Sequence, residues 1–339
     1  MASTNVWYNP TAVGQIKRIA NITGPGMVIF SALNMIFFSL DALHWIFGAF
    51  SYWLPFHGFL GLCGTGVCLF CNRWRFSCLG LVIVACSSLL LAKGYVPSPS
   101  ASETQAGIRL RVLQANLFAK NEDPSRFFQL IDESRPDLMV LQEVAGPWEQ
   151  TLSPLPLSFP HGLVGSEDQG VRKDLKQYSR LLASKPESLS KKGVPGYWTV
   201  VTGTDMNLNL ISIHTRAPFS PYRAKRHKEQ MKALTDVCKK MSGPLIVVGD
   251  FNSSTWSQLF RELTRGKRLV SARSGFGILG TWPSSLGPFR TPIDHILVSP
   301  EIQVLRCWVG PDIGSDHRPL LADLLVPLKL DLDRQTDSK

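Results

Sequence analysis

Residues 244–252 read Pro-Leu-Ile-Val-Val-Gly-Asp-Phe-Asn, an apolar run of strand length that ends in a glycine, a carboxylate and a carboxamide. A short apolar run bounded by turn-forming residues is typical of a buried β-strand. Asp250 and Asn252 therefore follow the end of a predicted strand, where side chains from several strands of one sheet converge. This stretch predicts a sheet with polar groups gathered at one edge.

The same pattern recurs along the chain. Five other segments place a polar residue at or beside a predicted strand: Asn116 after 108–112, Glu143 after 138–141, His214 after 208–213, Asp294 within 293–298, and Asp316 with His317 before 320–326. One Asp or Asn at such a place usually caps a turn. Six such segments together favour a single polar cleft built from distant parts of the chain. Helices predicted over 124–133 and 223–241 alternate with the strands, which indicates an α/β fold.

The order of these motifs resembles the endonuclease/exonuclease/phosphatase superfamily, which includes the DNase I-like nucleases, neutral sphingomyelinases and inositol polyphosphate 5-phosphatases. The resemblance covers residues 108–326. It rests on Gly-Asp-Phe-Asn at 249–252 and Ser-Asp-His-Arg-Pro at 315–319, after an early Asn116 and the Leu-Gln-Glu of 141–143. It implies a four-layer α/β/β/α sandwich (DNase I-like) and metal-dependent cleavage of phosphate esters.

A phosphate ester is anionic, so attack by water requires neutralised charge and an activated nucleophile. Glu143 offers a hard carboxylate for Mg²⁺, with Asn116 as a neutral oxygen ligand or a partner of the ligand. The resemblance implies that Asp316 joins this metal site. Few protein ligands suit Mg²⁺, which keeps several waters and takes substrate oxygens. We expect Mg²⁺ as the cofactor, with Mn²⁺ as an alternative.

The predicted catalytic residues are two histidines and their polar neighbours. His317 is the candidate general base, because a reference pKa near 6.5 suits proton transfer around neutrality. The resemblance implies that Asp294 orients this imidazole and that Asp250 positions the nucleophile or the metal. It also implies that Asn252 donates a hydrogen bond to the phosphoryl oxygen and that His214 binds the phosphate.

Two departures from the family pattern leave the substrate class open. The segment that usually ends in Ser-Arg-x-Pro reads Ser-Arg-Leu-Leu-Ala-Ser-Lys-Pro at 179–186, and His295 follows Asp294 where relatives often have Tyr. A lipid headgroup and a nucleic acid therefore both remain candidate substrates. The formal net charge of +10 is compatible with either. The basic helix predicted at 223–241 either binds nucleic acid or forms a solvated face.

The N-terminal region is predicted to cross a membrane. Charged residues make up 18% of the chain, below the roughly 25% of soluble domains, and the shortage lies in the first 94 residues. Three apolar stretches reach the length of a span. We predict an anchor over 1–94 with spans at 25–44, 54–71 and 76–93, a linker over 95–106, a catalytic domain over 107–328 and a polar tail over 329–339. This architecture resembles a bacterial membrane-anchored branch of the family.

The basic residues predict which side of the membrane carries the catalytic domain. Lys17 and Arg18 precede the first span, and Arg73 and Arg75 lie between the second and third. Cytoplasmic loops are enriched in Lys and Arg, so both segments are expected inside. Three crossings then place the catalytic domain outside the cytoplasm, anchored in the cell or inner membrane. An even number of crossings would reverse this placement.

Two further questions stay open from the sequence. The first is whether the chain is an enzyme or a non-catalytic membrane-bound binding module that kept the fold. Retention of both a metal ligand, Glu143, and a base, His317, favours the enzyme. The second is whether Cys238 and Cys307 are bonded, because sequence alone does not predict a pairing.

Overall fold

The computed structural model describes residues 10–40, 46, 48, 50–97, 106–161, 163–164, 173–203, 205–265 and 268–328. The chain divides into two compact units, Met1–Ala92 and Lys93–Lys339. The predicted linker is described only at 95–97 and 106, and the predicted tail over 329–339 lies outside the described residues.

Unit 1 is built from apolar helices: α1 (Pro10–Ser39), η1 (Phe50–Trp53), α3 (Leu54–Phe70) and α4 (Trp74–Ala92). Among the residues that the structure describes, three segments are long and apolar enough to cross a membrane: Gly14–Ser39, Phe50–Phe70 and Trp74–Tyr95. The first helix and the first of these segments both begin before the predicted span at residue 25, and both include Lys17 and Arg18.

Unit 2 contains two β-sheets. The first holds, in spatial order, β12 (Gln303–Val309), β13 (Leu320–Pro327), β1 (Gly107–Asn116), β2 (Leu138–Gln142), β4 (Lys176–Ser179) and β3 (Leu163–Val164). The second holds β10 (Val270–Ser271), β11 (Asp294–Val298), β9 (Leu245–Asp250), β8 (Met206–His214), β7 (Gly196–Gly203) and β5 (Leu182–Ala183), with β6 (Glu187–Ser188) also paired to β7. Within these mixed sheets β1 runs parallel to β2, and β8 runs parallel to β9.

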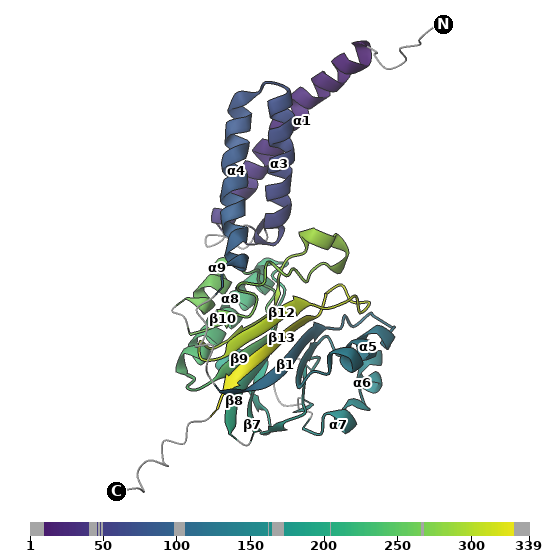
Figure 1. Ribbon diagram of the computed structural model, residues 1–339, viewed down its shortest axis with the longest axis vertical. Coiled ribbons are helices and arrows are strands. Elements are labelled where there is room, and N and C mark those ends of the chain that lie inside the picture. The colour runs from purple at the N-terminus through teal and green to yellow at the C-terminus, as the bar shows by residue number, and fades with distance from the viewer. Residues whose placement is uncertain are drawn as a thin grey trace. The chain divides into compact units, whose positions relative to one another are not determined.

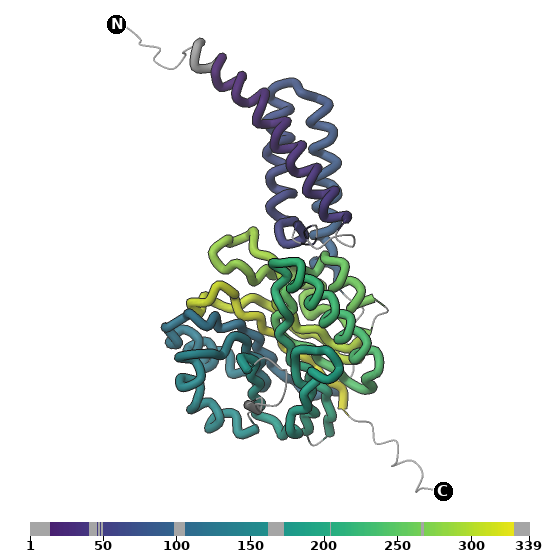
Figure 2. Tube along the Cα trace, turned by 180° about the vertical axis from the view of Figure 1, so that it is seen from behind, coloured from purple at the N-terminus to yellow at the C-terminus, as the bar shows by residue number. Residues whose placement is uncertain are grey.

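Helices cover the outer face of each sheet (Figure 1). The helices α5 (Ser125–Ser134), α6 (Pro147–Thr151) and α7 (Leu155–Ser158) pack on the first sheet, and α8 (Pro221–Lys240) and α9 (Gln258–Thr264) pack on the second. Figure 2 shows the same two groups of helices from behind. Three short 3₁₀ segments complete the unit: η2 (Lys93–Tyr95), η3 (Ser190–Lys192) and η4 (Ser284–Phe289). The predicted four-layer α/β/β/α sandwich is confirmed.

Alternation along the strands decides which residues fill which layer. On β1, Leu110 and Val112 enter the core between the sheets, whereas Leu113 and Ala115 pack under the helices of the first sheet. On β9, Ile246 and Val248 take the inter-sheet side in the same way. The two cysteines of unit 2 are buried free thiols in different clusters, Cys238 beneath α8 and Cys307 between the sheets.

A buried polar network fastens the loop after β10 to β11. The guanidinium of Arg273 lies with Nη1 3.0 Å from Nδ1 of His295, and its Nε donates to the Leu279 carbonyl at 3.1 Å. Nε2 of His295 lies 2.8 Å from the Ser253 carbonyl oxygen, which only accepts, so this nitrogen carries the proton. Burial, reinforced by the charge of Arg273, lowers the pKa of His295 well below its usual value. His295 is therefore neutral, and its Nδ1 accepts a hydrogen bond from the buried guanidinium of Arg273.

We expect His295→Ala to lower the free energy of unfolding by about 2–4 kcal/mol. The substitution removes the acceptor of a buried guanidinium and leaves a cavity beside Phe251 and Phe260, whose rings contact the imidazole. Denaturant unfolding of the full chain in detergent micelles measures the change. Leu157→Ala, at a side chain that is 90% exposed, is the control and should change little. Equal stability of the His295 variant and the wild type would contradict the role of this network.

Candidate active site

The polar residues lie at one end of the layer between the sheets, on the faces that elsewhere carry the inter-sheet core. Asn116 continues the side of β1 that holds Leu110 and Val112, and Asp250 continues the side of β9 that holds Ile246 and Val248. In the second sheet, Asp250 pairs in register with His214 on one side and with Asp294 on the other. Three predicted site residues thus sit in one row across β8, β9 and β11.

The glycine before Asp250 is required by sterics. A Cβ atom on Gly249 would collide with the carbonyl oxygen of Ile213 on the neighbouring strand. The absence of a side chain lets β8 and β9 approach closely just where His214 and Asp250 face each other. The close approach of the two strands explains why glycine precedes Asp250 in the motif.

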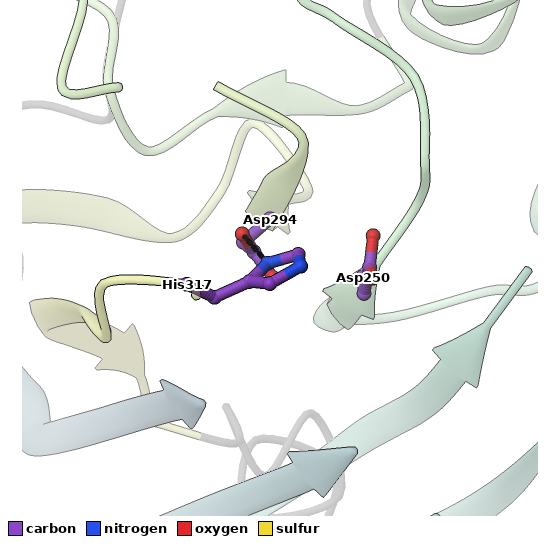
Figure 3. Close-up of side chains that lie close together, drawn as sticks. All are labelled: Asp250, Asp294 and His317. Atoms are coloured by element: carbon purple, nitrogen blue, oxygen red, sulfur yellow. Dashed lines mark hydrogen bonds and ion pairs between the residues drawn. The ribbon is translucent and has the colours of Figure 1, made fainter. Parts of the chain in front are cut away.

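His317 and Asp294 form a buried hydrogen-bonded pair. Nδ1 of His317 lies 2.8 Å from Oδ2 of Asp294, and the other carboxylate oxygen accepts from Nε2 of Gln114 at 2.7 Å. Figure 3 shows the imidazole between the carboxylates of Asp294 and Asp250. These three side chains bring potential ligand atoms within 4.8 Å of one another.

Burial and the charges of neighbouring carboxylates set the pKa values in this cluster. Burial opposes a charge on His317, but Asp294, Asp250 and Asp316 raise its pKa to about 10. Burial and the charge of Asp294 raise the pKa of Asp250 to about 6. Burial raises the pKa of Asp294, whereas the charge of His317 and the hydrogen bonds to the carboxylate lower it. The net effect is a lowered pKa. At neutral pH the cation-free pair is an imidazolium beside a carboxylate.

Glu143 and Asp316 form a second acidic group. Glu143 adopts a left-handed backbone conformation, with φ of 57°, directly after β2. Its carboxylate accepts from Nδ2 of Asn116 at 3.1 Å and from the Ala119 amide at 3.3 Å. Asp316 accepts from Nε1 of Trp282 at 3.3 Å. Burial raises the pKa of Asp316, and the charge of Glu143 adds to this rise.

Asn116 connects the two acidic groups. Its Nδ2 donates to Glu143 and also lies 3.3 Å from Oδ2 of Asp250. Its Oδ1 accepts from the Phe118 amide at 3.0 Å. This orientation suits a residue that holds the Glu143 carboxylate in place.

His214 lies between two carboxylates. Its Nε2 is 3.7 Å from Oδ2 of Asp250, and its Nδ1 is 3.5 Å from Oδ2 of Asp174. Asn252, also in a left-handed conformation with φ of 44°, donates its backbone amide to Asp250 at 2.8 Å and its Nδ2 to the Thr215 carbonyl at 3.1 Å. Non-glycine residues with a left-handed backbone conformation occur often at functional sites.

The structure therefore brings all eight predicted site residues together. Sequence reasoning missed other residues that contact them, among them Gln114, Asp174 and Trp282. Gln114 was detectable, because it alternates with Asn116 on β1 and must face the same side. Asp174 and Trp282 lie in irregular segments that carry no periodic signal.

The donors fit a hard divalent cation. Asp316 Oδ1 is buried and has no hydrogen-bond partner among the residues that the structure describes. Two nearby carboxylates that repel each other supply the oxygen donors that Mg²⁺ and Mn²⁺ accept. The residues that would hold such an ion are Glu143 and Asp316, with Asn116 beside them.

Comparison with known proteins identifies the family. The model of the endonuclease/exonuclease/phosphatase family matches residues 113–317, and the chain belongs to this family.

Individual relatives match over limited segments. The chain is 27% identical over 156 residues to craniofacial development protein 2 of Tragulus javanicus, covering 38% of this chain and 27% of that protein. It is 30% identical over 114 residues to a UPF0294 protein of Vibrio cholerae, covering 33% of this chain and 38% of that protein. The chain thus spans well under half the length of these curated relatives.

Solved structures support the fold. An endonuclease/exonuclease/phosphatase family protein of Bacteroides thetaiotaomicron aligns with a TM-score of 0.52 at 19% identity, covering 66% of this chain and 99% of that one. A humanized D. rerio TDP2 aligns with a TM-score of 0.51 at 14% identity, covering 64% and 98%.

We expect the stability that His317 contributes to the cation-free protein to fall as the pH rises. The pKa of His317 is about 10 in the folded chain and about 6.5 when unfolded, so the folded state holds the proton more tightly. The contribution is complete below pH 6.5 and is lost as the pH rises through 10.

Unfolding midpoints of the wild type and His317→Gln, measured in EDTA from pH 6 to pH 10, test this expectation. The difference between the two proteins should shrink across this range. A difference that does not change with pH would contradict the assigned shift.

Proposed function

We propose that the protein is a membrane-anchored, metal-dependent phosphoesterase in which His317 activates water for attack on a phosphodiester or phosphomonoester. The observation that carries this proposal is the buried 2.8 Å pair of His317 and Asp294 beside Asp250 and a second acidic group. A base with its orienting carboxylate, next to oxygen ligands for a cation, is the equipment that hydrolysis of an anionic ester requires.

In this proposal each residue of the site has a separate role. Asp294 holds Nδ1 of His317, so Nε2 is the atom that takes the proton from water. The oxygen of that water bonds to phosphorus and the bond from phosphorus to the ester oxygen breaks. The leaving oxygen takes a proton from solvent, and His317 afterwards releases to solvent the proton that it accepted. Asp250 positions the water, while Asn252 and His214 contact the phosphoryl oxygens.

The proposed metal site consists of Glu143 and Asp316, with Asn116 orienting Glu143 or adding an oxygen. A bound Mg²⁺ or Mn²⁺ would supply Lewis-acid polarisation of the phosphate and a positive charge that lowers the pKa of His317. This matters because His317 acts as a base only when its imidazole is neutral, and the surrounding carboxylates raise its pKa to about 10.

The three apolar helices support membrane anchoring. We propose that residues 1–94 form a multi-pass anchor in the cell or inner membrane and that the catalytic domain, 107–328, lies outside the cytoplasm. Nε of Arg73 donates to Oδ1 of Asn21 at 2.9 Å, which joins the turn between α3 and α4 to the early part of α1. The basic residues of both segments, including Lys17 and Arg75, therefore belong to the same end of unit 1, as the positive-inside rule requires.

The alternative function is a non-catalytic binding module. A binding module needs no buried base, and burying an ionised pair is costly. Retention of the His317–Asp294 pair, with a hydrogen bond from Gln114, therefore favours the enzyme. The two functions differ in one measurement, hydrolysis of bis(p-nitrophenyl) phosphate by the full chain with and without EDTA.

We expect Glu143→Ala to remove most metal-dependent hydrolysis of bis(p-nitrophenyl) phosphate without unfolding the chain, because it deletes a metal carboxylate. We expect His317→Ala to lower kcat by at least about 100-fold, as loss of a general base does. Steady-state rates in micelles across a Mg²⁺ titration test both expectations. Glu149→Ala, at a carboxylate on α6, is the matched control. Unchanged Mg²⁺ dependence in the Glu143 variant would refute the metal assignment.

We expect alkaline phosphatase fused after residue 100 to be active in a bacterial host. This reporter needs an oxidising compartment for its disulfides, and three crossings from an inside N-terminus deliver it there. The same reporter fused after Arg75 should be inactive, because that turn is expected to face the cytoplasm. An inactive fusion at residue 100 with normal expression would reject the outside placement.

A further inference from the structure

The segment that follows the third apolar helix is bound to a loop of unit 2. The carbonyl oxygen of Gly94 accepts backbone hydrogen bonds from Gly275 and Gly277, both at 3.0 Å. A side chain on Gly277 would meet the ring of Tyr95 at 3.2 Å, so the close approach depends on glycine there. We call these four residues the clasp. All of them belong to unit 2, whose first residue, Lys93, directly follows the end of α4.

The clasp loop leads directly into the active site. The buried Arg273 holds the loop from within, through the Leu279 carbonyl and His295. Five residues after Gly277 the chain reaches Trp282, whose indole donates to Asp316 and whose ring centroid lies 6.5 Å from that of His317. One short segment therefore carries both the clasp and a wall of the catalytic site.

Apolar side chains are exposed beside this wall. The ring of Phe219, 60% exposed, lies 6.5 Å from that of Trp282 and comes from the loop after His214. Leu286, 37% exposed, lies on η4, whose first residue, Ser284, donates its backbone amide to the Asp316 carbonyl at 2.7 Å. We define Phe219, Trp282 and Leu286 as the entrance rim.

We infer that the entrance rim contacts the interfacial region of a lipid bilayer and that the substrate is a membrane phospholipid. This inference rests on the proposed function. Trp side chains favour the headgroup level of a membrane, and Phe and Leu are the apolar side chains that interfacial segments bury beside it. Gly94 lies two residues beyond Ala92, the last residue of α4, so the clasp joins the loop that carries Trp282 to the first residues after the proposed anchor. A water-soluble ester would need neither the tether nor the exposed apolar rim.

The test compares three substrates with the full chain in proteoliposomes. The vesicles contain equal parts of phosphatidylcholine, phosphatidylethanolamine, phosphatidylglycerol, phosphatidylinositol and sphingomyelin, and mass spectrometry follows the lipid products. Bis(p-nitrophenyl) phosphate and a single-stranded DNA oligonucleotide are the soluble substrates. We expect EDTA-sensitive loss of at least one lipid. The double variant Phe219→Ser/Leu286→Ser should lower the ratio of the lipid rate to the soluble-ester rate at least tenfold.

The ratio protects the test from misfolding, because a smaller folded fraction lowers both rates equally. Leu157→Ser, which removes another exposed apolar side chain on α7, should leave the ratio within twofold of wild type. Hydrolysis of the soluble ester or the oligonucleotide without lipid hydrolysis would overturn the inference and leave the proposed function standing. An unchanged ratio in the double variant would also overturn it. No hydrolysis of the soluble ester by the wild type would instead refute the proposed function.

Discussion

The hydrogen bond between His317 and Asp294 joins two ionisable groups that are both withdrawn from water. Desolvating each ion costs several kcal/mol, and the fold must offset that cost with well-placed partners. Gln114 on β1 donates to the free oxygen of Asp294, and a hydrogen bond from Thr281 also stabilises its charge. The pair therefore depends on both sheets, because Asp294 comes from one and Gln114 from the other.

Strand alternation explains why one edge of the sandwich is polar. The inner faces are apolar through the middle of the inter-sheet layer, where Val112, Leu210 and Val248 meet. Toward the ends of the parallel pairs β1–β2 and β8–β9 the same faces become polar, as at Asn116 and Asp250. The site is thus a continuation of the core in polar residues, and its geometry is as rigid as the packing behind it.

Most of the fold could be predicted because its signals are local. Apolar runs such as 244–248 and their polar ends need no knowledge of distant contacts, and the motif order supplied the arrangement. Asp174 could not be predicted as a partner of His214, because an irregular segment brings it there. The first helix, α1, also begins before the predicted span, since a helix can extend beyond the apolar stretch that identifies a span. The buried Arg273–His295 network was missed because a charged residue in a loop is normally solvated.

The charge of the site constrains its chemistry more than any single contact. Asp250, Asp294, Asp316 and Glu143 lie around two histidines. The charges of Asp294, Asp250 and Asp316 raise the pKa of His317. Burial and the charge of Asp294 raise the pKa of Asp250. In the proposed reaction these negative charges would repel an anionic phosphate, and they would hold a proton on His317, the proposed base. A divalent cation among these carboxylates relieves both problems, because it attracts the phosphate and disfavours the imidazolium. The surplus of carboxylates is therefore the feature of the site that supports the proposed metal dependence.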